Sequence, residues 1–197
     1  MKTLVMKKLF LLLSLAVCIS YTGYAQTENP DSKNLTKEEK KAMRKAKKEE
    51  DKRKRKEALI EFEKYAEMRE WVVEAHTVFD KQGQSYQMDP NINFVGVDKD
   101  ETTVQLSFTG LMGWNGVGGV TLEGKIGKYE YSNDGKSLNI TMSAMGSGLG
   151  VVDIFMTVTG DGNGRATVSG NWGERITFQG KFVSLEESTV YKGTITY

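Results

Sequence analysis

Residues 133–164 read NDGKSLNITMSAMGSGLGVVDIFMTVTGDGNG. Two sets of apolar side chains stand at alternate positions in this stretch: Leu138, Ile140 and Met142, then Val152, Ile154, Met156 and Val158. A period of two is typical of β-strands that bury one face. The stretch is bounded by Asn-Asp-Gly and by Gly-Asp-Gly-Asn-Gly, which supply the positive φ angles that tight hairpins require. It therefore predicts neighbouring antiparallel strands.

The same period recurs on both sides of this stretch. The further apolar runs contain Val73, Ala75, Thr77 and Phe79; Ile92 and Phe94; Val104, Leu106 and Phe108; Val120, Leu122 and Ile126; and Ile176, Phe178 and Phe182, with a short run from Arg165 to Ser169. Seven or eight short strands with one apolar face each favour a single curled antiparallel sheet or a partly open barrel.

Charge divides the chain into two unlike regions. From Lys33 to Glu70 there are 15 basic and 10 acidic residues and neither glycine nor proline. From Trp71 to Tyr197 there are 9 basic and 14 acidic residues and 20 of the 21 glycines. The first composition predicts a basic helical arm, and the second predicts a glycine-rich, acidic β domain.

The helix is predicted to begin at a capping box formed by Thr36 and Glu39. Residues 36–57 offer almost no apolar stripe, so they are expected to stay solvated. From Ala58 onward, Leu59, Phe62 and Ala66 recur at helical spacing, which predicts packing of one helix face on the sheet. The fold class is thus mainly β (α+β), with an N-terminal basic helix docked by its C-terminal half.

The first 25 residues have the pattern of a secretory signal peptide. Lysines precede the apolar run from Leu9 to Ile19, and small residues follow it up to Ala25. Cleavage after Ala25 would remove three lysines and leave 24 basic and 26 acidic residues. We expect a signal peptide at 1–25, a charged arm at 26–57 and a helix plus β domain at 58–197, in a periplasmic or secreted protein. A lipoprotein acylated at Cys18 is the alternative.

Three segments carry a family resemblance. They are Trp71-Val72-Val73-Glu74-Ala75, the glycine-rich stretch ending in Gly118-Gly119-Val120-Thr121-Leu122-Glu123-Gly124, and Leu185-Glu186-Glu187-Ser188-Thr189-Val190-Tyr191-Lys192-Gly193. They resemble the domain-of-unknown-function family 4251, which is common in Bacteroidetes and typically secreted or lipid-anchored. The likeness covers about residues 58–197. It implies a helix before a mostly antiparallel β domain, and it implies no catalytic residue.

Little in the composition points to catalysis. His76 is the single histidine and Cys18 the single cysteine, which excludes a multi-histidine metal centre and an intrachain disulfide. The glycine-rich stretch 110–119 lacks the lysine of a P-loop. We therefore expect no metal, no cofactor and no enzyme activity. A carboxylate-based hydrolase would need neither histidine nor cysteine, and its candidate residues are Glu123, Glu130, Glu186 and Glu187.

Two groups of residues are candidates for binding. The first consists of aromatic residues that can stack on a glycan or hold an apolar ligand: Trp114, Trp172, Tyr129 and Tyr131. The second is the basic run Lys52, Arg53, Lys54, Arg55 and Lys56, a candidate contact for an anionic surface. The export signal argues against nucleic acid as the partner, and the mature chain has no predicted transmembrane span.

Three classes of function follow from these patterns. The first is an exported, non-enzymatic module of the cell envelope that binds a small apolar or glycan ligand or an envelope protein. The second is a structural or tethering protein whose basic arm contacts an anionic surface. The third is the carboxylate-based hydrolase.

Overall fold

The computed structural model describes residues 36–107, 119–146, 150–170 and 175–193. The chain divides between Lys47 and Lys48 into two compact units, and this boundary lies inside the helix α2 (Lys37–Met68). Trp114, Trp172 and Cys18 lie outside the described residues. Among the residues described, no helix is long and apolar enough to cross a membrane.

The capping box at the start of α2 forms as predicted. The backbone N–H of Thr36 donates to Glu39 Oε2 at 2.8 Å, and the N–H of Glu39 donates back to Thr36 Oγ1 at 3.3 Å. These hydrogen bonds, first among them the one from the Thr36 backbone, lower the pKa of Glu39. Residues 36–57 are exposed, and Leu59 is the first helical residue to be buried. Docking of the C-terminal part of the helix is thereby confirmed.

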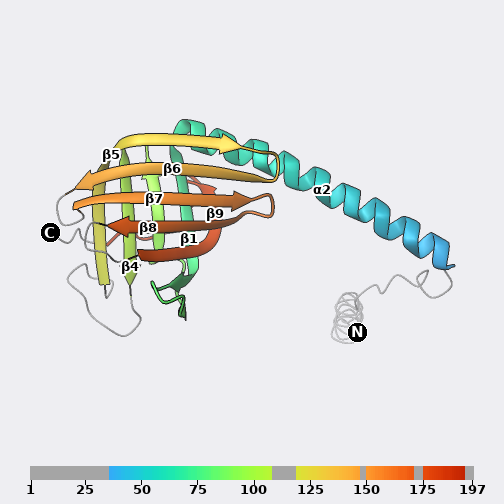
Figure 1. The fold of residues 1–197 in the computed structure, drawn as a ribbon, viewed down its shortest axis with the longest axis horizontal. Helices are drawn as coiled ribbons and strands as arrows, with labels where there is room; N and C mark the ends of the chain where they lie inside the picture. Colours follow the sequence, from blue (N-terminus) through green and yellow to red (C-terminus); the bar gives the residue numbers. More distant parts are fainter. Residues whose placement is uncertain (1–35, 108–118, 147–149, 171–174, 194–197) are drawn as a thin grey trace, which may run out of the picture. The chain divides into compact units, whose positions relative to one another are not determined.

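In the described part of the chain, nine antiparallel strands follow the helix (Figure 1). They are β1 (Glu70–Phe79), β2 (Ser85–Gln87), β3 (Phe94–Asp98), β4 (Glu101–Ser107), β5 (Gly119–Asn133), β6 (Ser137–Gly146), β7 (Gly150–Thr159), β8 (Asn163–Gly170) and β9 (Arg175–Ser184). Consecutive strands pair from β3 to β9, and β1 pairs with both β3 and β9. Eight strands therefore close into a barrel, with β2 added to the last residues of β1. The mainly β fold class is confirmed, and the β1–β9 pairing shows that the sheet closes into a barrel.

The predicted hairpins carry the expected turn chemistry. Gly135 and Gly162 adopt φ angles of 75° and 81°, which favour glycine. In the first turn, Asp134 Oδ1 accepts hydrogen bonds from the backbone N–H groups of Lys136 at 2.8 Å and Ser137 at 2.7 Å. These local contacts explain why the turn residues could be identified without knowledge of the barrel.

A bulge in β1 corrects the predicted alternation. The register between β1 and β9 shifts between Ala75 and Thr77, so His76 is an extra residue on its strand. Beyond the bulge, Val78 rather than Thr77 joins the apolar core, and Phe79 stacks under an arginine of β8. The expectation that Thr77 and Phe79 continue the inward face of Ala75 is wrong, because the bulge reverses the sides.

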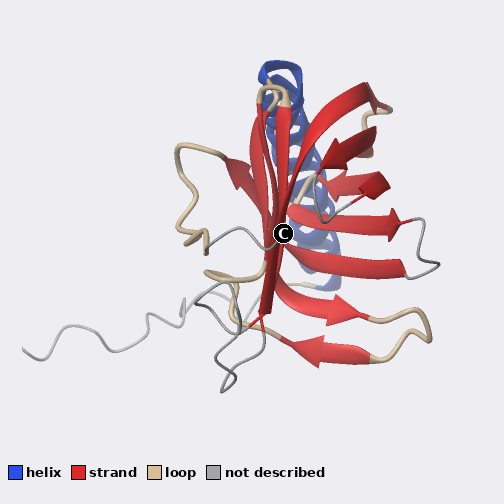
Figure 2. Cartoon of the chain, turned by 90° about the vertical axis from the view of Figure 1, so that its left-hand side faces the viewer, coloured by secondary structure: helices blue, strands red, loops and turns tan. Residues whose placement is uncertain are grey.

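The core lies inside the barrel and includes residues of the C-terminal part of α2. Figure 2 shows the helix against the strands of the barrel. Leu59 and Ala66 are buried with Trp71 and Phe182, and the rings of Phe62 and Phe182 meet edge to face at 5.5 Å. The part of the helix from Leu59 to Ala66 lies at the end of the barrel where β1 begins and where β5 turns into β6. The other end, where β1 and β4 finish and β9 begins, is called the mouth below.

A second apolar cluster lies on the outer wall of the barrel. Val72, Phe94 and Val183 point outward from β1, β3 and β9, yet all three are buried. Leu185 and Val190 cover them. We call residues 185–193, which follow β9 and return over this wall, the C-terminal strap.

Two polar side chains of the wall fasten the C-terminal strap. Glu74 Oε1 accepts a hydrogen bond from the backbone N–H of Thr189 at 2.8 Å. Gln105, which is fully buried, donates through Nε2 to the carbonyl of Tyr191 at 2.8 Å and accepts at Oε1 from the N–H of Gly193 at 2.8 Å. The segment Leu185–Gly193, one of the three segments that carry the family resemblance, thus closes the outer side of the barrel wall.

Candidate functional site

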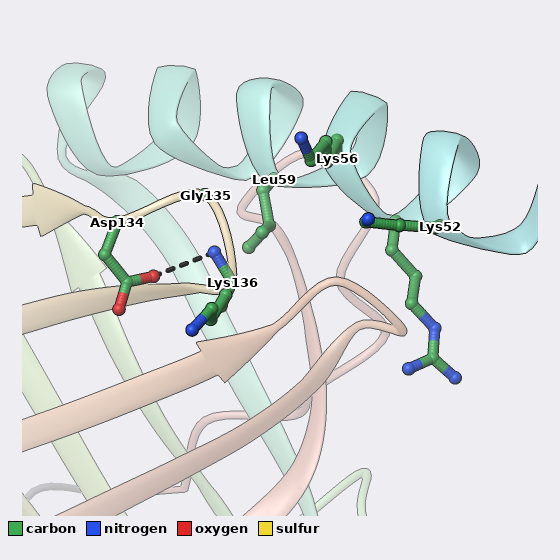
Figure 3. A pocket seen from close by; sticks show the side chains of 7 residues that line it. Lys52, Lys56, Leu59, Asp134, Gly135 and Lys136 are labelled. Carbon is green, nitrogen blue, oxygen red and sulfur yellow. Dashed lines mark hydrogen bonds between the residues drawn. The ribbon is translucent and has the colours of Figure 1, made fainter. Parts of the chain in front are cut away.

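A basic groove lies between α2 and the turn from β5 to β6. It encloses about 380 Å³ and is lined by Lys52, Arg55, Lys56, Leu59, Asp134, Gly135 and Lys136. The helical members recur at spacings of three and four residues, so they share one face of α2. Figure 3 shows Lys52 and Lys56 on the helix and Lys136 on the turn opposite them. Four cationic side chains therefore surround one hollow.

The basic groove has a net positive charge, because four cationic side chains line it and Asp134 is the one carboxylate among its lining residues. Hydrogen bonds from the backbone N–H groups of Ser137 and Lys136 lower the pKa of Asp134, which therefore stays ionised as the acceptor of the turn. Leu59 is buried at the base of the groove. The arrangement can hold a phosphate, sulfate or carboxylate group among flexible ammonium groups and one guanidinium.

The structure separates the predicted basic run into two sets. Lys52, Arg55 and Lys56 line the basic groove, whereas Arg53 and Lys54 form ion pairs along the helix. Lys54 Nζ lies 2.8 Å from a Glu50 carboxylate oxygen, and Arg53 Nε lies 3.7 Å from one of Glu57. The sequence suggested a uniform basic surface, but only one helix face meets the barrel.

The turn from β7 to β8 holds the helix beside the basic groove. A Cβ atom placed on Gly160 would lie 2.5 Å from the backbone oxygen of Arg55. Glycine is therefore needed here for close approach between turn and helix. In the same turn, Asp161 Oδ1 accepts from the Thr159 hydroxyl and from the N–H of Asn163, and the first of these hydrogen bonds lowers the Asp161 pKa. Asp161 and Asn163 thus form a hairpin, as the sequence predicted.

A second hollow, the mouth cavity, lies at the barrel end away from α2. It has a volume of about 310 Å³ and is lined mostly by apolar side chains: Val78, Phe79, Asp80, Tyr86, Met88, Leu106 and Ile176. Tyr86 belongs to β2, and the N–H of Met88 donates to the His76 carbonyl at 2.9 Å. The short strand β2 and the residue after it thereby form one side of the cavity.

The aromatic candidates occupy different parts of the chain. Trp114 and Trp172 lie outside the described residues. The strand ends that flank Trp114 in the sequence, Ser107 and Gly119, are at the mouth, and so are those that flank Trp172, Gly170 and Arg175. Tyr129 and Tyr131 lie on β5 near α2, with ring centroids 6.4 Å apart. The two tyrosines are therefore far along the barrel from the mouth cavity.

Tyr129 connects the helix to the core. Its hydroxyl donates to the Ala66 carbonyl at 2.9 Å and accepts from Trp71 Nε1 at 3.0 Å. The Arg69 guanidinium lies 4.8 Å from the centre of its ring. Burial raises the pKa of Tyr129 to about 12, so the hydroxyl keeps its proton at neutral pH. Tyr131 is 39% exposed and remains a surface aromatic.

The carboxylates considered for hydrolysis point away from the barrel interior. Glu123 forms an ion pair with Lys192 of the C-terminal strap, and Glu130 lies 3.2 Å from Lys128 Nζ. Glu186 and Glu187 follow the end of β9. His76 is exposed, with Nδ1 2.9 Å from the Thr77 hydroxyl. Within the described ranges, no group of three or more His, Cys, Asp or Glu residues is placed to hold a metal ion.

Sequence reasoning missed the residues that complete both hollows. No sequence pattern singles out Lys136, Val78 or Met88 for binding, and Ile176 is predicted only as part of a strand. Asn133-Asp134-Gly135 locates the turn, but nothing local indicates which helix face lies above it. The bulge at His76 likewise hid the inward direction of Val78.

Comparison with known proteins gives a family and a related structure. The model of the family described as "Domain of unknown function (DUF4251)" matches residues 47–182. A crystal structure of a DUF4251 family protein from Bacteroides eggerthii is 31% identical, with a TM-score of 0.55, and the likeness covers 66% of this chain and 90% of that chain. No curated protein is significantly similar. The family match ends before the C-terminal strap.

Proposed function

The chain belongs to the DUF4251 family, and we propose that it is an exported, non-enzymatic binding module of the cell envelope whose barrel takes up a small apolar ligand at its mouth. The mouth cavity carries this proposal. Its volume of about 310 Å³ is at the low end of the roughly 300–1,000 Å³ of small-molecule sites, and open barrel ends are common places for them. Export is inferred from the pattern of residues 1–25.

The lining supports an apolar ligand over a sugar. Val78, Leu106 and Ile176 project from three different strands into the cavity, and Met88 adds a flexible thioether that adapts to irregular shapes. Tyr86 is 44% exposed at the rim. Its hydroxyl donates to Gln84 Oε1 at 3.0 Å, so its polar end is engaged outside the cavity while its ring faces the hollow.

Binding of the neutral fluorescent probe N-phenyl-1-naphthylamine to the full chain tests the proposal. Met88→Glu puts a carboxylate into the apolar lining, so we expect affinity for the probe to fall about tenfold or more. Met145→Glu is the matched control, because Met145 is 66% exposed on β6. Absence of binding by the unmodified chain, or equal binding by the Met88→Glu variant, would contradict the proposal.

The basic groove favours a second function, attachment to an anionic surface of the envelope. Lys52, Arg55 and Lys56 meet Lys136 around one hollow, although Lys136 is remote from them in sequence. Each cation near an anionic membrane surface contributes about 1 kcal/mol. Lipid or lipopolysaccharide phosphates have the complementary charge.

Sedimentation with phosphatidylglycerol vesicles at low salt tests the second function. Lys52→Gln combined with Lys56→Gln removes two groove charges, and we expect binding to weaken roughly 30-fold. Arg53→Gln combined with Lys54→Gln removes the same charge from ion-paired positions on the same helix and is expected to weaken binding less. Equal effects of the two variants would show that overall charge, and not the groove, drives association.

A further inference from the structure

A cationic patch lies on the outer wall beside the mouth cavity. It surrounds a hollow of about 260 Å³ lined by Phe79, Asp80, Lys81, Gly83, Arg165, Thr167, Arg175 and Thr177. We call this group the rim patch. Thr167 pairs in register with Thr177, which in turn pairs with Phe79, so the patch crosses β8, β9 and β1. Three of its side chains are basic and one is acidic.

The rim patch and the mouth cavity are joined at the ends of two strands. In β1, Val78 belongs to the interior while Phe79 lies under an arginine outside, and in β9 Ile176 lines the mouth cavity while Arg175 lines the rim patch. Successive side chains of a strand point to opposite faces. Phe79 and Asp80 line both hollows. The two hollows are therefore neighbours.

Asp80, the acidic residue of the rim patch, accepts hydrogen bonds from residues of the connection between β1 and β2 and from Tyr86. Asp80 Oδ1 accepts hydrogen bonds from the N–H groups of Gln82 and Gln84, both at 2.9 Å, and Oδ2 accepts from the Tyr86 hydroxyl at 3.3 Å. Its carboxylate is thus directed toward the connection between β1 and β2. The excess charge of the patch is positive.

Arg165 is held in position for an anion. Its guanidinium lies 4.7 Å from the centre of the Phe79 ring, and Nη1 donates to Gln179 Oε1 at 3.3 Å. These contacts use the ring face and one nitrogen, and the planar guanidinium has other N–H groups for a carboxylate or phosphate. Thr167 and Thr177, whose hydroxyl oxygens are 3.1 Å apart, supply neutral hydroxyls between Arg165 and Arg175.

We propose that the ligand is an amphipathic anion, with a short acyl chain in the mouth cavity and an anionic head group on Arg165 and Arg175 of the rim patch. This inference rests on the proposed function and specifies its ligand class. The cavity volume favours a short chain, because about 310 Å³ is near the lower limit for ligand sites. The basic groove is at the other barrel end and takes no part.

Calorimetric titration of the full chain with octanoate and with 1-octanol tests the two parts separately. We expect octanoate to bind roughly tenfold tighter than 1-octanol at low salt, because hydrogen bonds between charged groups are stronger than neutral ones. Added salt should reduce that difference. Each methylene added between hexanoate and octanoate should increase affinity about fourfold until the cavity is full.

The double variant Arg165→Gln, Arg175→Gln should bind octanoate and 1-octanol with equal affinity. Its affinity for 1-octanol should equal that of the unmodified chain, which also shows that the variant is folded. Lys125→Gln with Lys181→Gln removes the same charge from exposed positions on β5 and β9 and should bind octanoate as the unmodified chain does. Equal octanoate and 1-octanol affinities in the unmodified chain would overturn the anion inference but leave the apolar site. Failure of both compounds to bind would overturn both proposals.

Discussion

Gln105 offers the sharpest test of how the barrel wall is built. Its side-chain amide is fully buried and uses its whole hydrogen-bonding capacity. Nε2 donates to the carbonyls of Ile92 at 3.0 Å and Tyr191 at 2.8 Å, and Oε1 accepts from Gly193 N–H and from the Thr121 hydroxyl, both at 2.8 Å. One side chain thus joins β4, β5, the segment before β3 and the C-terminal strap.

Gln105→Leu keeps most of the volume but removes all four hydrogen bonds. Each buried polar group left without a partner costs about 1–3 kcal/mol. If the C-terminal strap detaches, the backbone groups of Tyr191 and Gly193 can form hydrogen bonds with water instead. The loss of stability from these two groups therefore cannot exceed the free energy with which the strap docks. We therefore expect a loss of about 2–4 kcal/mol in the free energy of unfolding.

Urea denaturation and amide hydrogen exchange distinguish local from global effects. The N–H groups of Thr189 and Gly193 should exchange faster in Gln105→Leu, while those of the barrel strand β6 should stay protected below the unfolding transition. Gln87→Leu is the control, because Gln87 is exposed on β2 and should change stability by less than about 0.5 kcal/mol. A loss below about 1 kcal/mol with unchanged exchange would refute the reasoning.

Three further predictions concern the helix, its docking and the N-terminus. Gly160→Ala should lower the free energy of unfolding by about 1–3 kcal/mol in urea denaturation, because the new Cβ would meet the Arg55 backbone. Gly127→Ala is the control: its Cβ would meet nothing closer than 4.0 Å, so it should lower the free energy of unfolding less. Tyr129→Phe leaves the Trp71 indole N–H and the Ala66 carbonyl without their partner and should cost about 1–3 kcal/mol. Burial raises the Tyr129 pKa to about 12, above the usual value near 10. The contribution of the Tyr129 hydroxyl to the free energy of unfolding should therefore be complete below pH 10 and disappear as the pH rises toward 12. A Tyr129→Phe variant whose stability falls with alkaline pH in the same way as that of the unmodified chain would contradict this. Mass spectrometry of the exported protein should find Gln26 as the first residue, and a lipid-modified Cys18 would contradict it.

The helix shows which predictions local chemistry supports. The capping box of Thr36 and Glu39 and the apolar spacing of Leu59 and Ala66 both depend on residues within one or two helical turns. Both predictions are confirmed. Arg53 pairs with Glu57, although Glu49 is also one helical turn away, because sequence spacing does not choose between the two acids.

The strands show where periodicity fails. All eight predicted strands are present, but β2 was missed because three exposed residues carry no apolar alternation. The β1 bulge at His76 also has no local signature. It appears only when β1 is aligned with β9, about a hundred residues later in the chain, and it decides that Val78 faces the mouth cavity.

The sequence by itself determined the helix start, the strand segments, the hairpin turns and the family resemblance, because each depends on residues close together in the chain. The tertiary structure alone decided that β1 meets β9 to close the barrel, that Lys136 faces Lys52 and Lys56, and that Arg165 and Arg175 line the same hollow. These contacts join residues far apart in sequence. Their geometry depends on barrel closure and strand register, which a pattern of neighbouring residues does not encode.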